Sequence, residues 1–464
     1  MVFSSPLFLF LFLPLFLGIY YLLPKKGIVR TLWILMGSWV FYGLWRVDFL
    51  GLLILVTLGN WLAGLALSTE WPQLQHRRKT VVTIAVVLNL LVLGYFKYAN
   101  FGIDTLNALF DGPDLSLGMR IILPVGISFY IFQAMSYTID VYRGDAPAAR
   151  SFVKLAAYIA LFPQLIAGPI VRYKDLSNQL DEPHVSAGRV VRGFRRFILG
   201  LGKKILLADT LAPLVEGAFE LAAPSLADSW IGVVAYSLQL YFDFAAYSDM
   251  AIGLGLMLGF RFRENFRFPY HSLSVTEFWQ RWHMSLSTWL RDYLYIPLGG
   301  NRVSGRRTHI NLLLVMGLGG LWHGAAWNFV LWGLWHGVIL LTERRSPELY
   351  RPGATEGWRT MVLRVRLLLI VGLGWVFFRA PDLEGALRVV AGLFGGFHAE
   401  GYGLSSAFAW QVQPFALATL GIGLVVAGGE HRKFRGGPLV WVLLGVSIMK
   451  LLADSYSPFL YFQF

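Results

Sequence analysis

The chain has 464 residues, of which 56% are hydrophobic, 16% aromatic and only 14% charged. A soluble domain is about one quarter charged, so this composition is typical of a protein that crosses a membrane several times. The formal net charge is +13 and cysteine is absent, which excludes disulfides, thiolate metal sites and a cysteine acyl carrier within this chain.

The first apolar run, residues 7–23, is about long enough to cross a bilayer. We interpret it as a retained span, because no basic segment precedes it and no small-residue cleavage site follows. Lys25, Lys26 and Arg30 come directly after it, and the next basic loop covers residues 76–79. Basic loops favour the cytoplasmic side, so we predict an outward N-terminus and contacts with anionic lipid headgroups, not with nucleic acid.

Further spans are expected in the first 140 residues at 32–44, 49–67, 81–96 and 121–139. From residue 152 the pattern is irregular, because Pro163, Gly168 and Pro169 interrupt an apolar run. Broken segments at membrane depth are tolerated where protein or a cavity surrounds them.

A basic amphipathic helix is expected next. Its basic side contains Arg189, Arg192, Arg195, Arg196, Lys203 and Lys204. We expect this helix on the cytoplasmic surface, where its cations contact lipid headgroups or, alternatively, the phosphates of a nucleotide-containing donor.

The run 230–260 is long enough for a tilted span. It carries Gln239, Asp243 and Tyr247 at successive i, i+4 positions, and hence on one face. An unpaired carboxylate in lipid is costly, so this face should look into the protein. Asp243 is therefore a candidate supporting residue, and the spacing leaves open whether its role is structural or catalytic.

Four of the nine histidines lie between residues 281 and 337. An aromatic stripe at helical spacing runs through Phe278, Trp282, Leu286, Trp289 and Tyr293. The stripe predicts an amphipathic helix that is interfacial or re-entrant. His283 and Ser287 are one turn apart and lie off the stripe.

His323 is flanked by two apolar segments, 312–321 and 329–341, which follow a basic turn at 301–309. Glycines 317, 319, 320 and 324 predict a helix break or a close helix approach there, which would open the imidazole to a cavity. A neutral imidazole can accept the proton of an attacking hydroxyl, which is the general-base step that acyl transfer needs. The alternative is a structural histidine, bonded to backbone or to an indole such as Trp322.

His336 is not expected to share that site. On one continuous helix it would lie about 20 Å from His323 and on the opposite face. No histidine or carboxylate pair at ligand spacing accompanies either residue, so no metal site is predicted. The last spans are expected at 362–378, 415–426 and 439–452, with a basic loop at 430–437. We predict an all-α polytopic membrane protein of roughly eleven transmembrane or re-entrant helices in one domain, residues 1–464.

The run 277–302, which contains Arg281-Trp282-His283, resembles the signature of the membrane-bound O-acyltransferase family. Segments 94–98, 162–169 and 240–244 are similar to that family as well, so the resemblance covers most of the chain up to Gly337. It implies that His323, in Leu321-Trp322-His323-Gly324, is catalytic and that His283 is a second important residue.

The resemblance also implies a many-helix fold around a central funnel in the bacterial inner membrane. Acetyl-CoA would be the donor, with no further cofactor. The product would be an O-acetylated exopolysaccharide such as alginate, cellulose or a related polymer. The acceptor would be the polymer itself or a serine of a periplasmic acetyltransferase partner. A transporter or channel for a small acyl donor, and a passive anchor for a secretion complex, are the competing interpretations.

Overall fold

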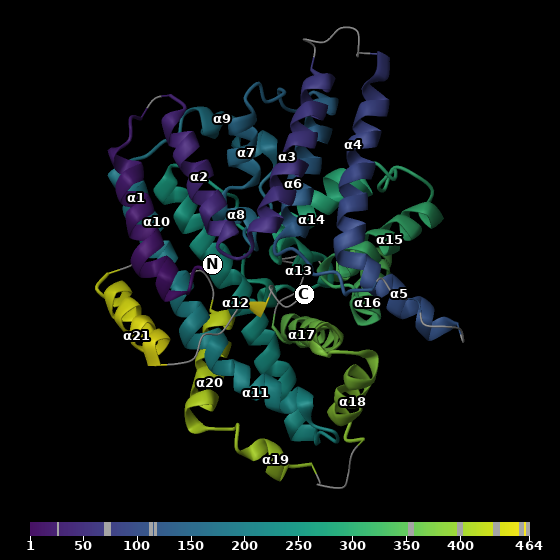
Figure 1. The fold of residues 1–464 in the computed structure, drawn as a ribbon. Coiled ribbons are helices and arrows are strands. Elements are labelled where there is room, and N and C mark those ends of the chain that lie inside the picture. The colour runs from purple at the N-terminus through teal and green to yellow at the C-terminus, as the bar shows by residue number, and fades with distance from the viewer. Residues whose placement is uncertain are drawn as a thin grey trace. The chain divides into compact units, whose positions relative to one another are not determined.

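The computed structural model describes residues 1–25, 27–68, 76–110, 115, 118–350, 357–396, 402–429, 437–453 and 459–460. Every element among these residues is helical (Figure 1), which confirms the predicted all-α class. Lys26, a residue of the first predicted basic loop, lies outside the described residues, and so do residues 430–436 of the last predicted basic loop.

Long apolar helices confirm the membrane character of the chain. Within the described residues, the stretches that are long and apolar enough to cross a membrane are 47–67, 78–109 and 358–379, and shorter apolar helices cover 7–22, 414–428 and 439–453. The count of roughly eleven helices and the central funnel stay predictions.

The chain folds into two compact units, the first of residues 1–198 and 247–263 and the second of residues 199–246 and 264–464. Two helices, α10 (Ala187–Gly202) and α12 (Leu226–Leu258), run through a unit boundary. The assignment of one domain to residues 1–464 stays a prediction. All candidate site residues named above belong to the second unit.

The first unit contains η1 (Leu7–Phe12), α1 (Leu13–Leu22), α2 (Val29–Gly43), α3 (Val47–Leu67), α4 (Arg78–Leu93), η3 (Gly94–Tyr98), α5 (Ala99–Leu109), α6 (Ile127–Arg143), α7 (Phe152–Ile159), α8 (Phe162–Leu165) and α9 (Tyr173–Asp181). Asn60 of α3 and Asn89 of α4 exchange amide hydrogen bonds of 3.1 and 3.0 Å, and Thr138 of α6 donates to Asn60 at 2.8 Å. Lipid offers polar groups no hydrogen-bond partner, so these side chains bond to one another. The buried bonds therefore hold α3, α4 and α6 together.

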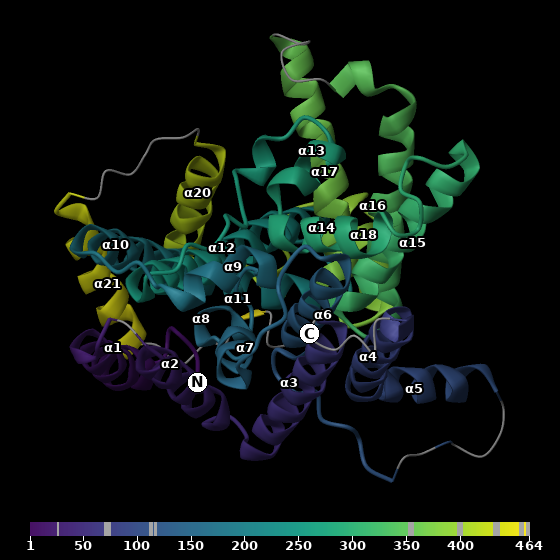
Figure 2. The ribbon, with the colours of Figure 1, turned by 90° about the horizontal axis from the view of Figure 1, so that it is seen from above.

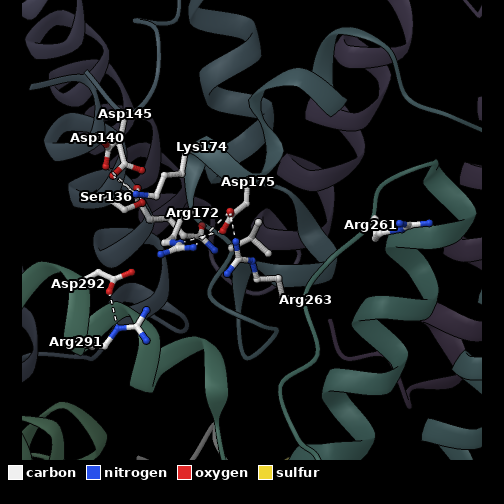
Figure 3. A network of polar contacts seen from close by, with 12 residues as sticks. Ser136, Asp140, Asp145, Arg172, Lys174, Asp175, Arg261, Arg263, Arg291 and Asp292 are labelled. Carbon is white, nitrogen blue, oxygen red and sulfur yellow. Dashed lines mark hydrogen bonds and ion pairs between the residues drawn. The ribbon is translucent and has the colours of Figure 1, made fainter. Parts of the chain in front are cut away.

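An ionic network holds α9 to the end of α6 (Figure 3). Nζ of Lys174 lies 2.9 Å from Asp145 and 3.5 Å from the buried Asp140. One residue along α9, Asp175 pairs with Arg172 at 2.9 Å and with Arg263 at 2.7 Å. The charges of this network therefore serve packing within the first unit.

The predicted basic helix forms as α10, and the interpretation of two of its cations was wrong. Arg196 pairs with Asp249 of α12 at 2.9 Å. Lys204, in the π-helical segment η4 (Lys203–Ala208) that follows, is buried between two carboxylates. Lys204 is therefore unavailable to headgroups and Arg196 is engaged in an ion pair, whereas Arg192 and Arg195 are exposed.

The second unit begins with η4 and α11 (Asp209–Glu220). It continues through η5 (Pro269–His271), α13 (Val275–Arg281), α14 (Met284–Leu290), η6 (Arg291–Tyr295), α15 (Gly305–His323), α16 (Trp327–Arg345), η7 (Pro347–Tyr350), α17 (Trp358–Arg379), α18 (Leu383–Leu393), α19 (Ser406–Ala409), α20 (Pro414–Gly428) and α21 (Leu439–Ala453).

Helices α15 and α16 form a tight hairpin and lie side by side in Figures 1 and 2. A Cβ atom at Gly320 would lie 2.1 Å from the carbonyl oxygen of Phe329, and one at Gly333 would lie 2.2 Å from that of Met316. Only glycine permits this approach, which confirms the close helix contact predicted beside His323.

Candidate active site

His323 is the last residue of α15, and its side chain is buried. The helix ends there, as the glycines predicted, because Gly324 adopts extended backbone angles. The imidazole lies among aromatic rings, with centroid distances of 5.0 Å to Trp322, 5.1 Å to Trp332 and 5.3 Å to Phe378. Contacts with these three rings therefore restrict its position.

The predicted continuous helix over the aromatic stripe is broken at His283, which corrects the sequence interpretation. Helix α13 ends at Arg281, α14 begins at Met284, and His283 between them has a left-handed φ of 42°. Asn265 holds this turn: its carbonyl accepts from the Met284 amide at 2.9 Å, and its side chain accepts from the Ser285 amide and hydroxyl. An uncommon backbone conformation at a non-glycine residue is typical of functional sites.

The break brings the two candidate histidines together. The side chain of His283 is fully buried, and its ring centroid lies 6.0 Å from that of His323 and 5.8 Å from that of Trp322. Phe244 of α12 packs edge-on against His283 at 4.6 Å. Three of the predicted site residues, His283, Trp322 and His323, thus form one cluster.

A cavity of about 180 Å³ lies beside this cluster. Its wall includes His323, Ser287 of α14, Gly319 of α15 and Trp332 of α16. The buried Ser287 hydroxyl has no hydrogen-bond partner among the described residues, so it can bond to a molecule in the cavity. Arg291, also in the wall, is exposed and pairs with Asp292 at 2.7 Å (Figure 3).

His336 lies closer to the site than the sequence suggested, because the chain turns back after His323. Both histidines contact Trp332, at centroid distances of 5.1 Å for His323 and 5.4 Å for His336. His336 is nevertheless outside the wall of the 180 Å³ cavity and packs against Trp279 at 5.4 Å. Neither of its ring nitrogens has a partner in the part of the chain that the structure describes.

Asp243 contacts a buried lysine that sequence reasoning did not connect with it. Its Oδ1 lies 2.8 Å from Nζ of Lys204, which also lies 2.7 Å from Asp209. Its Oδ2 accepts from the amide of Leu460 at 2.8 Å. Asp243 thus anchors the part of α12 that presents the next residue, Phe244, to His283.

Glu343 is a second residue that the sequence did not single out. It is buried near the end of α16, and its carboxylate accepts from the backbone amides of Val275 and Thr276 at 2.9 Å each. It also pairs with Arg366 of α17 at 3.1 Å. A carboxylate from α16 therefore caps the start of α13, the helix that leads to His283.

Comparison with known proteins gives a family match over residues 34–377, to the membrane-bound O-acyltransferase family. The chain is 46% identical to the probable alginate O-acetylase of Azotobacter vinelandii and 45% identical to that of Pseudomonas putida, over the full length of each pair. It is 35% identical to the peptidoglycan O-acetyltransferase of Helicobacter pylori, over 85% of this chain and 80% of that protein. The matched region contains the clustered histidines and the cavity beside them.

Proposed function

We propose that this chain, which belongs to the membrane-bound O-acyltransferase family, transfers acetyl groups from acetyl-CoA toward a hydroxyl of an exopolysaccharide such as alginate. The observation that carries the proposal is the cavity in which the imidazole of His323 and the unpartnered hydroxyl of Ser287 share one wall. Family membership favours this reaction over transport or passive anchoring. The names of the relatives support a polysaccharide as the final product.

His323 acts as the general base in this proposal. A ring nitrogen takes the proton from the attacking hydroxyl while the hydroxyl oxygen forms a bond to the thioester carbonyl carbon. The tetrahedral intermediate then loses the thiolate of coenzyme A, which takes up the proton as the carbon–sulfur bond breaks. The three aromatic rings in contact with His323 hold the base in place, and preorganisation of this kind is a large part of catalysis.

The size of the cavity supports a short acyl group. Its volume of about 180 Å³ is below the ~300–1,000 Å³ of pockets that enclose drug-sized ligands. It therefore fits an acetyl thioester end and not the nucleotide of the donor. A polymer does not fit either, so the proposal includes a periplasmic partner that completes the transfer.

The test is a comparison of three histidine variants in membranes that contain equal amounts of folded protein. Removal of a general base costs about 10²- to 10⁴-fold in rate, so His323→Ala should lose nearly all acetyl transfer. His336→Ala, the matched control from the same aromatic cluster, should keep most activity. His283→Ala should fall between them, because His283 adjoins the base without lining the cavity wall.

Transfer is measured as coenzyme A release that depends on an added hydroxyl acceptor. Thermal unfolding of each purified variant controls for misfolding. A wild-type rate for His323→Ala, or an inactive but folded His336→Ala, would show that the base has been assigned wrongly.

A further inference from the structure

A second, larger cavity lies in the second unit, apart from the histidine cluster. Its volume is about 460 Å³, and residues of α12, η5, α17, α18 and α20 line it. Most of the wall is aliphatic, including Val233, Leu238 and Val371. This volume and apolar character are those of sites that bind small molecules.

Two basic side chains interrupt the apolar wall. Nε of Arg364 and both ring nitrogens of His271 are buried and have no hydrogen-bond partner among the described residues. Buried polar groups in native proteins are almost always bonded, so the unpartnered Nε of Arg364 in such a wall indicates an external acceptor. A guanidinium prefers an anion with two oxygens, such as a phosphate or a carboxylate.

The cavity opens where lipid is expected. Helix α17 is apolar and long enough to cross a membrane, and its cavity residues Leu368 and Leu369 are 43% and 49% exposed. Arg364 is six residues from the start of α17, which is about 9 Å along the helix axis. An arginine at that depth extends its head toward the membrane surface.

We propose that this cavity binds one anionic phospholipid, with an acyl chain against the aliphatic wall and the headgroup phosphate bonded by Arg364. Three observations favour a phospholipid: the cavity wall is mostly aliphatic, the buried Nε of the half-buried Arg364 has no protein acceptor among the described residues, and exposed wall residues lie on a helix long and apolar enough to cross a membrane. The strong positive charge of the chain also concentrates anionic lipid around it. The site does not depend on which acyl group the protein transfers.

The test uses the purified full chain, equilibrated with equal amounts of phosphatidylglycerol and phosphatidylcholine and examined by native mass spectrometry. The wild type should retain one phosphatidylglycerol, with a preference of about tenfold. Both lipids offer a phosphate to Arg364, but the choline cation of phosphatidylcholine repels the guanidinium, whereas phosphatidylglycerol carries no cation. Arg364→Gln should lose the preference. Val234→Trp, which places an indole in the cavity and narrows the space for an acyl chain, should retain neither lipid.

Arg359→Gln is the matched control, since Arg359 is exposed on the same helix and outside the cavity wall. It should bind lipid as the wild type does. Thermal unfolding separates loss of the lipid from loss of the fold, and Val234→Trp decides the matter if Arg364→Gln is unstable. The proposal fails if the wild type retains both lipids equally, if both cavity variants keep phosphatidylglycerol, or if glycerol phosphate without acyl chains competes as well as the lipid.

Discussion

Two serines of α14 differ in what their hydroxyls contact. Ser285 donates to the side chain of Asn265 at 2.9 Å and so helps to hold the turn at His283. Ser287, two residues later, lines the cavity with His323 and has no partner among the described residues. The first hydroxyl is committed to the fold, whereas the second is available to a ligand.

Ser287→Ala is therefore expected to lower kcat/KM about two- to tenfold, because one hydrogen bond to a neutral group is worth about 0.5–1.5 kcal/mol. Its unfolding temperature should not change, since no protein bond is lost. Ser285→Ala should mainly lower the unfolding temperature, because it removes the hydrogen bond to Asn265. Steady-state kinetics and thermal unfolding of both variants check this pair. An unchanged kcat/KM for Ser287→Ala would mean that the hydroxyl does not contact the substrate.

The sequence could name candidate site residues but not their partners. The sequence predicts that Asp243 needs a partner, and the structure shows that this partner is Lys204. From the sequence, Lys204 is instead expected among the cations that face headgroups. Helical spacing gives the face on which a side chain lies, whereas burial depends on what packs against that face. Asp209, five residues after Lys204, supplies the second carboxylate that makes burial of the lysine tolerable.

At the scale of the element, the sequence predicted the end of α15 correctly and the continuity of the aromatic stripe wrongly. Glycines around His323 are a direct signal, because they remove the side chains that keep helices apart. The break at His283 has no such signal: Trp282, His283 and Met284 all suit a helix interior. Asn265 enforces the break from 18 residues away in the chain, so it depends on tertiary contacts.

Substitution of Glu343 tests whether the position of α13 affects stability and acetyl transfer. In Glu343→Gln the amide NH₂ group would face the backbone N–H donors of Val275 or Thr276, and the ion pair with Arg366 is lost. Leaving a buried donor unsatisfied costs about 1–3 kcal/mol. We expect a lower unfolding temperature together with slower acetyl transfer per folded molecule, because α13 leads directly to His283.

The control is Glu348→Gln, a change at an exposed glutamate five residues later in the chain. It should alter neither quantity. Thermal unfolding gives the stability, and coenzyme A release at matched folded protein gives the activity. If Glu343→Gln unfolds at the wild-type temperature, the carboxylate cap does not stabilise α13.

At the scale of the whole molecule, the small cavity at His323 sets a limit on the acceptor. A polysaccharide chain cannot enter a space of about 180 Å³, whereas a small alcohol can. Helices account for most of the described chain, and the chain belongs to a family of membrane-bound enzymes. Under the proposed function, this chain carries out the acyl transfer step and a partner recognises the polymer.

We therefore expect liposomes that contain only this chain and acetyl-CoA to acetylate a small alcohol but to leave alginate close to background. Addition of a periplasmic acetyltransferase partner should start polymer acetylation, because the partner presents a hydroxyl that fits the cavity and then passes the acetyl group to the polymer. Acetyl content of the recovered alginate measures the outcome, and liposomes with His323→Ala set the background. Full acetylation of alginate by the wild-type chain alone would mean that the polymer reaches His323 directly, through an opening larger than this cavity.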